Sequence, residues 1–283
     1  MATTAVERAG ATAALGAGVA GPTRRRRRLF SAPWQPVAVF ALMIGLWYGL
    51  AAVYAGRGLP YFVPYPHRVL ASFTDPARQE DLLTALLSST RVTLTGLAIA
   101  VVLGMVWAIL MSQARWVERS LFPYAVVLQC VPILALVPLI GILFGYNFTA
   151  RVIVTVLIAL FPMVSMTLFG LQSVARPQRE LFVLQGASRW TLLTKLQLPA
   201  ALPSIFVGLR TSAGLAVVGA VVGDQFFQRG TPGLGVLIQV YASRLQGPDL
   251  YAAIIVAALL GVAVFLGFGW LGRLAVGRWY DFT

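Results

Sequence analysis

The residue types that most often carry covalent or metal chemistry are scarce in this sequence. It has one cysteine, Cys130, one histidine, His67, and one lysine, Lys195. A single cysteine allows no intrachain disulfide and no Cys-based metal site, and a single histidine has no second imidazole with which to share a metal. A phosphate-binding loop needs glycine amides followed by lysine, but Lys195 follows Leu-Leu-Thr. We therefore predict no ATPase, nucleophile or metal site in this chain. We expect Cys130, inside the third apolar run, to take part in helix packing, and His67 to lie in a surface loop.

The elements that position these residues are apolar. Of the 283 residues, 59% are hydrophobic and 11% are charged, which is too apolar for one soluble domain. Runs of roughly 20 apolar residues recur, and as helices they would each cross the roughly 30 Å hydrocarbon core of a bilayer. Residues 98–103 are apolar on every face, which favours helices over membrane strands. We expect an all-α membrane protein with six transmembrane helices: Trp34–Ala55, Val92–Met111, Leu121–Leu143, Val152–Leu171, Ser204–Val222 and Leu250–Leu271.

The basic residues predict the orientation of these spans. Fifteen of the 22 Lys and Arg residues lie on the face that would hold both termini, five of them in the cluster Arg24 to Arg28. The positive-inside rule then places both termini in the cytoplasm, and the net charge of +13 is a topology signal before it is a nucleic-acid signal. We expect residues 1–30 to be a disordered basic cytoplasmic tail and residues 31–283 to be the transmembrane domain. The first run is long for a signal peptide and precedes further spans, so an uncleaved helix is favoured.

Proline marks the irregular parts of the chain. Within the apolar runs lie Pro123, Pro132, Pro138 and Pro162; each removes a backbone hydrogen bond, so we expect kinked helices. The proline-rich stretch 59–66 is expected to be extended on the outer side. Residues 77–90 have leucines at helical spacing and should lie along the membrane or extend the second helix.

The longest predicted cytoplasmic loop runs from Ser173 to Leu202. Its first half, 177–185, begins with proline and ends before Gly186, which predicts one short helix. Ser188 can cap a second short helix over 189–197, which Pro199 should end. The loop is much longer than a helical hairpin needs, so we expect it to bind a partner.

The spacing within this loop resembles a known signature. Glu180, Gly186 six residues later, and then Leu196, Leu198 and Pro199 are similar to the signature Glu-Ala-Ala-x3-Gly-x9-Ile-x-Leu-Pro of ABC importer permeases. Leu181 and Phe182 replace its alanines, and Leu196 replaces its isoleucine. The segments 186–190, 198–203, 208–210 and 233–238 resemble the nitrate, sulfonate and taurine subfamily, and the resemblance covers about Trp34 to Trp279.

The resemblance implies a fold, partners and a location. The fold would be that of a type I ABC importer permease in the bacterial cytoplasmic (inner) membrane, with a second copy as a homodimer. Two cytoplasmic ATPase subunits would bind ATP and Mg, and an extracytoplasmic binding protein would deliver the solute, with no nucleic acid involved. The implied ATPase-docking residues are Arg179, Glu180, Leu181, Phe182, Gly186, Ala187, Ser188, Leu196, Leu198 and Pro199. From the residues alone, Glu180 is equally a solvated charge near a helix N-terminus.

Polar residues within the spans are the candidates for a translocation pathway, because polar groups in lipid usually face a bundle interior or a water-filled cavity. Asp224, near the outer end of the fifth span, is either a gate residue or an interfacial carboxylate paired with Arg229 or water. Arg151 and Arg210 lie near predicted span ends, where snorkelling would account for them. The candidate pathway residues are Gln129, Ser165, Thr211, Ser212 and Asp224.

Several alternatives remain open from the sequence. The resemblance implies a cargo such as a sulfonate, taurine, nitrate, riboflavin or a thiamine pyrimidine precursor, and a quaternary-amine permease is the nearest alternative. An ion-coupled secondary transporter should show internal repeats or a carboxylate near mid-bilayer. A membrane scaffold without a transport role would not need the loop.

Overall fold

The computed structural model describes residues 34–276, and all regular structure within that range is helical. The predicted tail over residues 1–30 lies outside the described residues. Five helices are long and apolar enough to cross a membrane, or six if α5 and α6 count as one broken span, which confirms the all-α membrane class. The elements are α2 (Trp34–Gly56), α3 (Pro66–Ser72), α4 (Pro76–Gln113), α5 (Arg115–Cys130), α6 (Ile133–Phe144), α7 (Phe148–Gln172), α8 (Arg176–Leu184), α9 (Arg189–Leu192), the π-helical η1 (Leu193–Gln197), α10 (Leu198–Phe226), α11 (Leu234–Ser243) and α12 (Gly247–Val276).

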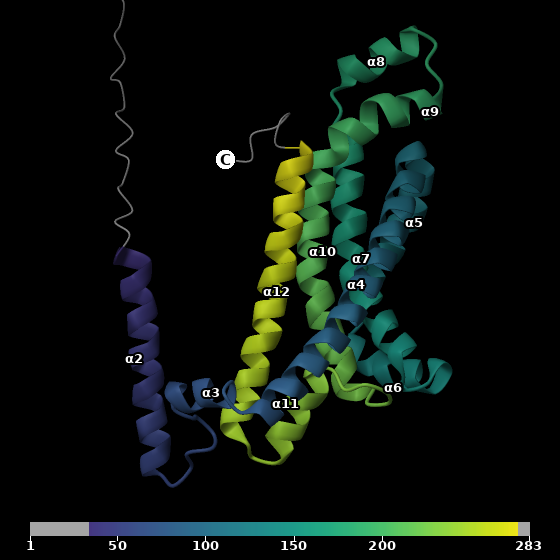
Figure 1. Cartoon of the computed structure of the whole chain (residues 1–283). Coiled ribbons are helices and arrows are strands. Elements are labelled where there is room, and N and C mark those ends of the chain that lie inside the picture. The colour runs from purple at the N-terminus through teal and green to yellow at the C-terminus, as the bar shows by residue number, and fades with distance from the viewer. Residues whose placement is uncertain (1–33, 277–283) are drawn as a thin grey trace, which may run out of the picture. The chain divides into compact units, whose positions relative to one another are not determined.

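The first half of α2 belongs to one compact unit, and a second unit begins at Leu46. Within the second unit, α10 packs on α7 and α12, and α4 packs on α7 (Figure 1). Glycines let α7 and α10 approach closely: a Cβ added at Gly208 would lie 2.8 Å from Cβ of Met166, and one at Gly219 would lie 2.8 Å from Cα of Thr155. Small residues at helix contacts are typical of membrane bundles. The pair α7–α10 therefore forms a closely packed centre.

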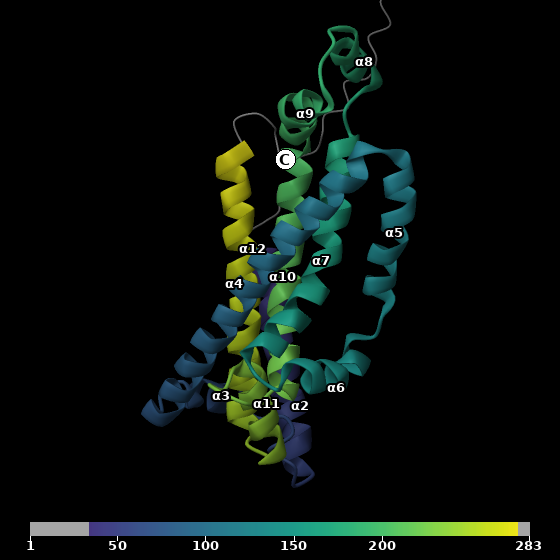
Figure 2. The same cartoon turned by 90° about the vertical axis from the view of Figure 1, so that its right-hand side faces the viewer.

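The predicted third span, Leu121–Leu143, is wrong as a single helix. Helices α5 and α6 meet at a bend of 96° around Val131 and Pro132. In Figure 2, α5 runs along the bundle and α6 lies across its end. Proline cannot donate the next backbone hydrogen bond and holds Val131 in an extended conformation, whereas Pro123 and Pro138 stay inside their helices.

The connection between the first two long helices follows the prediction in part. Residues 77–90 do extend the second span, because α4 is one helix of 38 residues that Asp75 caps through the backbone N–H of Ala77. The stretch before Pro66 is mostly turns. His67 lies in the first turn of α3 rather than in a loop, and its Nδ1 is 3.2 Å from the Tyr48 hydroxyl.

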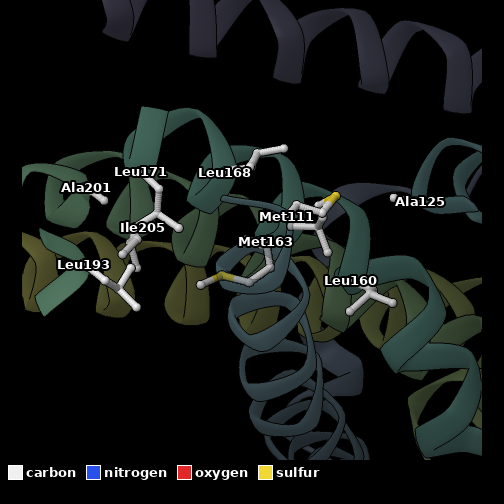
Figure 3. Packing of buried hydrophobic residues seen from close by; sticks show 11 residues of the cluster. Met111, Ala125, Leu160, Met163, Leu168, Leu171, Leu193, Ala201 and Ile205 are labelled. Atoms are coloured by element: carbon white, nitrogen blue, oxygen red, sulfur yellow. The ribbon is translucent and has the colours of Figure 1, made fainter. Parts of the chain in front are cut away.

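The main buried cluster joins the predicted loop, Ser173 to Leu202 and called the docking loop below, to the helices of the bundle. It contains Met111 from α4, Met163 and Leu171 from α7, and Leu193 from η1. Figure 3 shows Leu171, Leu193 and Ile205 together at one side of this cluster. The turn at Gly186, between α8 and α9, is called the elbow below. Because Leu193 is 3% exposed, the segment that follows the elbow is fixed to the transmembrane core.

Candidate functional site

Helix α8 carries an apolar surface that nothing in the described chain covers. It has no buried residue, and Leu184 is 85% exposed. Leu181, Val183 and, beyond the elbow, Trp190 are also more than half exposed. Figure 1 shows α8 projecting from one end of the bundle, the end where α12 finishes. Exposed apolar side chains clustered on one element outside the spans indicate a protein-contact surface.

The turn after α8 depends on a glycine. Gly186 has a φ of +72°, a left-handed conformation that costs side-chain-bearing residues free energy. A Cβ at this position would meet no atom within 4 Å, so the requirement is conformational and not a matter of space. The backbone N–H of Gly186 donates to Val183 O and that of Ala187 to Phe182 O, which closes the end of α8.

The segment after the elbow, residues 188–198, is fixed to the bundle by its buried side chains, and we call it the anchored arm. Ser188 caps α9 as predicted, since its Oγ accepts from the backbone N–H of Thr191 at 3.2 Å. The prediction that Pro199 ends this helix is wrong: helical backbone continues from Arg189 through η1 into α10, as far as Phe226. Five residues of π-helix shift the hydrogen-bond pattern just before Pro199, which then lies in the first turn of α10, where a missing N–H is tolerated.

A polar cavity of about 320 Å³ lies beneath the loop, where the α4–α5 corner faces the start of the loop. Arg179 lines it together with Arg115 and Glu118 of α5 and the buried Gln197 of η1. Of the predicted docking residues, Leu196 and Leu198 are half-buried on the anchored arm, whereas Glu180, Leu181 and Ser188 are exposed. The docking candidates thus divide into an exposed helix and an anchored arm.

A buried ion pair joins three helices at the opposite end of the bundle. Nη1 of Arg151 lies 3.2 Å from Oδ1 of Asp224, and their side chains are 2% and 0% exposed. The Ser89 hydroxyl donates to Oδ2 of Asp224 at 2.6 Å and accepts from the backbone N–H of Leu234 at 2.9 Å. Asp224 therefore pairs with Arg151 and Ser89, and not with Arg229.

Arg151 also organises the loop that follows α10. Its Nε, Nη1 and Nη2 donate to the backbone carbonyls of Phe227, Thr231 and Arg229 at 2.8, 2.9 and 3.1 Å. The snorkelling interpretation is wrong for this residue, because its guanidinium points into protein and not to the interface. The charge is neutralised by one carboxylate and its N–H groups are satisfied by backbone, which is how buried charges are usually accommodated.

An open cavity of about 570 Å³ adjoins the ion pair. Three arginines, Arg91, Arg151 and Arg229, are among its lining residues, and no acidic residue is. Arg151 is paired with Asp224, so Arg91 and Arg229 supply the basic character. Ser88 also lines it and donates to Thr231 O at 3.1 Å, which helps to hold its rim. This end of the bundle therefore presents a basic cavity.

The remaining pathway candidates do not gather in one place. Ser212 is fully buried and Ser165 half-buried, and neither hydroxyl has a hydrogen-bond partner within residues 34–276. Gln129 and Thr211 are exposed, and Thr211 donates to Val207 O. Cys130 is the last residue of α5 and is exposed, so within the described residues the expected helix packing is wrong. Among the described residues, no group of three His, Cys, Asp or Glu side chains could hold a metal ion.

Sequence reasoning missed Arg151 and Ser89 as partners of Asp224. A signal was present: Asp224 lies near the end of its predicted span, and Arg151 lies at the start of a span on the same predicted side. A carboxylate placed there needs a partner, and a cation at the same depth is the natural one.

Comparison with known proteins agrees with the geometry. Residues 100–279 match the family "Binding-protein-dependent transport system inner membrane component". The chain is 33% identical to the formylaminopyrimidine transport permease protein ThiX of Halalkalibacterium halodurans, over 85% of this chain and 92% of that one. It is 37% identical to the riboflavin transport system permease protein RibX of Chloroflexus aurantiacus, over 59% and 62%. It is 29% identical to the taurine transport system permease protein TauC of Escherichia coli, over 84% and 86%.

A solved structure is similar in fold. A crystal structure of an amino acid ABC transporter with histidines superposes with a TM-score of 0.54 at 20% identity, covering 71% of this chain and 94% of that one. At this identity the similarity concerns the fold alone. With the family match over most of the described bundle, it follows that the chain belongs to the binding-protein-dependent transport system inner membrane components, the permeases of ABC transporters.

Proposed function

We propose that this chain is the permease subunit of an ATP-driven importer and forms the translocation pathway for a small solute. An extracytoplasmic binding protein delivers the solute, and two separate cytoplasmic ATPase subunits bind ATP and Mg. The chain pairs with a second copy of itself and catalyses no covalent chemistry. It lies in the bacterial cytoplasmic membrane with both termini inside.

The observation that carries this proposal is the uncovered apolar surface of α8. Leu181, Val183 and Leu184 project from a helix outside the spans and are 55–85% exposed. Leaving such a surface in water loses the free energy of burying it, of order 25 cal/mol per Å² of apolar area. A groove on an ATPase subunit would cover it. Leu181 and Phe182, in place of the signature alanines, enlarge the surface that the groove must accept.

The helix that follows the elbow offers a route for motion. A displacement of the ATPase would act on α8 and, through the Ser188-capped turn, on α9. From Arg189 the helical backbone continues to Phe226, so the displacement would be transmitted along α10 to Asp224 and its partner Arg151. Closely packed α7 moves with α10, because the glycine contacts leave no space between them. The two ends of the bundle are thereby linked by one continuous element.

We expect the transported solute to resemble the solutes for which the relatives are named. Permeases named for formylaminopyrimidine, riboflavin and taurine transport suggest a sulfonate, taurine, nitrate or a vitamin-related compound such as riboflavin or a thiamine pyrimidine precursor. Arg91 and Arg229 at this cavity disfavour a quaternary amine, because their like charges would repel it there.

The test is reconstitution with a candidate ATPase subunit and a candidate binding protein. Glu180→Ala and Gly186→Ala should each reduce ATPase co-purification and solute uptake. Unchanged assembly and uptake in both variants would reject the docking assignment.

An inactive ATPase subunit should abolish uptake, while collapse of ion gradients should not. The reverse pattern would identify a secondary transporter. Ligands bound by the isolated binding protein would identify the cargo.

A further inference from the structure

Arg210 lies within the apolar part of the bundle without a counter-charge from the described residues. Its guanidinium carbon lies 3.9 Å from the centroid of the Phe265 ring on α12. Its Nε is buried and has no hydrogen-bond partner within residues 34–276, and none of the ion pairs there includes it. A cation at membrane depth is costly and normally pairs with an anion or with carbonyl groups. The ring face supplies part of this compensation, but residues 34–276 offer Arg210 no anionic partner.

A second arginine shares the cavity next to Arg210. Arg273 and Arg210 both line a cavity of about 130 Å³ between α10 and α12, and no acidic side chain lines it. Phe206 and Phe268 form apolar walls. Gly269 keeps the space open, because a Cβ there would lie 3.3 Å from Nε of Arg210. Two guanidinium groups around an empty space repel each other, and a bound anion would relieve the repulsion.

The surroundings of this cavity are those of a lipid-facing site. Val207 lines it and is 43% exposed, and Leu266 and Trp270 of α12, the helix that carries Gly269, are 55% and 61% exposed. Arg273 lies in the last turn of α12, at the end of the bundle that carries α8 (Figure 1). A tryptophan and an arginine near the end of an apolar helix mark the headgroup level of a membrane. An anion that reaches this cavity with apolar chains attached would satisfy both the arginines and the flanking side chains.

We infer that Arg210 and Arg273 bind the phosphate of an anionic phospholipid from the leaflet at the docking-loop end of the bundle. Basic pockets between transmembrane helices are suited to lipid headgroups. The bound phosphate would join α12 to α10, the helix that continues from the docking loop. This lipid site does not depend on the transported cargo, so it can be tested without knowing it.

The experiment uses the full chain purified from membranes. Native mass spectrometry and thermal unfolding would compare vesicles of phosphatidylcholine alone with vesicles that also contain phosphatidylglycerol. The variants are Arg210→Gln, Arg273→Gln and Gly269→Val, the last of which fills the cavity and keeps both charges. Arg244→Gln, at the opposite end of the bundle, is the matched control.

Phosphatidylglycerol should remain bound to the wild type and to Arg244→Gln and raise their unfolding temperatures. Each arginine removed should weaken its retention about fivefold, and Gly269→Val should reduce retention as well. Because Arg273 is exposed, its variant should fold normally even if Arg210→Gln does not. Equal retention by Arg273→Gln and the control would overturn the inference. So would equal protection by inorganic phosphate, which would show that the site takes a soluble anion.

Discussion

At the scale of single residues, the pair Arg151–Asp224 is the most consequential electrostatic contact in the described chain. Asp224→Asn keeps the shape but leaves the Arg151 charge buried without its counter-charge. We expect a loss of about 3 kcal/mol in stability, because breaking one side of a buried pair costs roughly 3–5 kcal/mol. Arg151→Leu should cost more, since three backbone carbonyls also lose their donors. Thermal unfolding in detergent measures both.

Asp75→Asn is the control for this prediction. Asp75 is half-exposed, its nearest cation is 3.9 Å away, and asparagine caps a helix about as well as aspartate. We expect no measurable change in its unfolding temperature. If Asp224→Asn unfolds at the same temperature as this control, the ion pair does not hold the outer end together. If that variant also transports normally, the gating hypothesis for Asp224 fails.

Gly186 has a conformational requirement that asparagine can meet in part. Gly186→Ala should strain the left-handed turn by about 1 kcal/mol, whereas Gly186→Asn should strain it less. Because α8 has no buried residue, the strain should loosen α8 and leave the bundle intact. Amide hydrogen exchange should therefore accelerate in α8 alone, more in the alanine variant than in the asparagine variant. Equal exchange in the wild type and both variants would show that the turn does not control α8.

At the scale of elements, the exposed face of α8 should account for ATPase binding. Leu184 is the most exposed large apolar side chain of α8, and Leu184→Gln replaces it with a polar one. We expect severalfold weaker ATPase co-purification. Stability of the isolated permease should not change, because Leu184 is 85% exposed. Leu70→Gln is the matched control: Leu70 is 66% exposed on α3, at the far end of the bundle. A loss of ATPase in both variants would point to a general assembly defect.

The break between α5 and α6 can be probed with the natural thiol. Cys130 is the only cysteine, it is exposed, and it ends α5 beside Gln129. A thiol reacts with maleimides as the thiolate, which requires water. If the break borders the translocation pathway, Cys130 should react with a water-soluble maleimide in assembled transporter, and added solute should slow the reaction. Cys130→Ala gives the background. No reaction in native membranes, with full reaction after denaturation, would place the break against lipid or protein.

At the scale of the whole molecule, the sequence predicts what depends on local composition. Apolar runs of helical length predict the long helices, and Ser188 and Gly186 predict the elbow, because cap and turn chemistry acts over a few residues. Local reasoning does not predict the effect of each proline. Pro132 lies at a break of 96° between two helices, whereas Pro199 lies within continuous helix. Their outcomes depend on the packing of α6 against α7 and of η1 in the core. The pairing of Arg151 with Asp224 joins residues 73 positions apart, which no local pattern specifies.

The orientation of the whole molecule is the last prediction. Figure 2 shows the start of α5 and the helices α8 and α9 at one end of the bundle, where α12 also ends. By sequence, the start of α5 carries Arg115 and Arg119, and α8 and α9 carry Arg179 and Arg189. From the positive-inside rule we predict that this end faces the cytoplasm. In a Cys130→Ala background, Ser243→Cys at the end of α11 should react with a membrane-impermeant maleimide in intact cells. Ser188→Cys should react only after permeabilisation. The opposite labelling pattern would show that the orientation is the reverse of the predicted one, with α8 on the side away from any cytoplasmic ATPase.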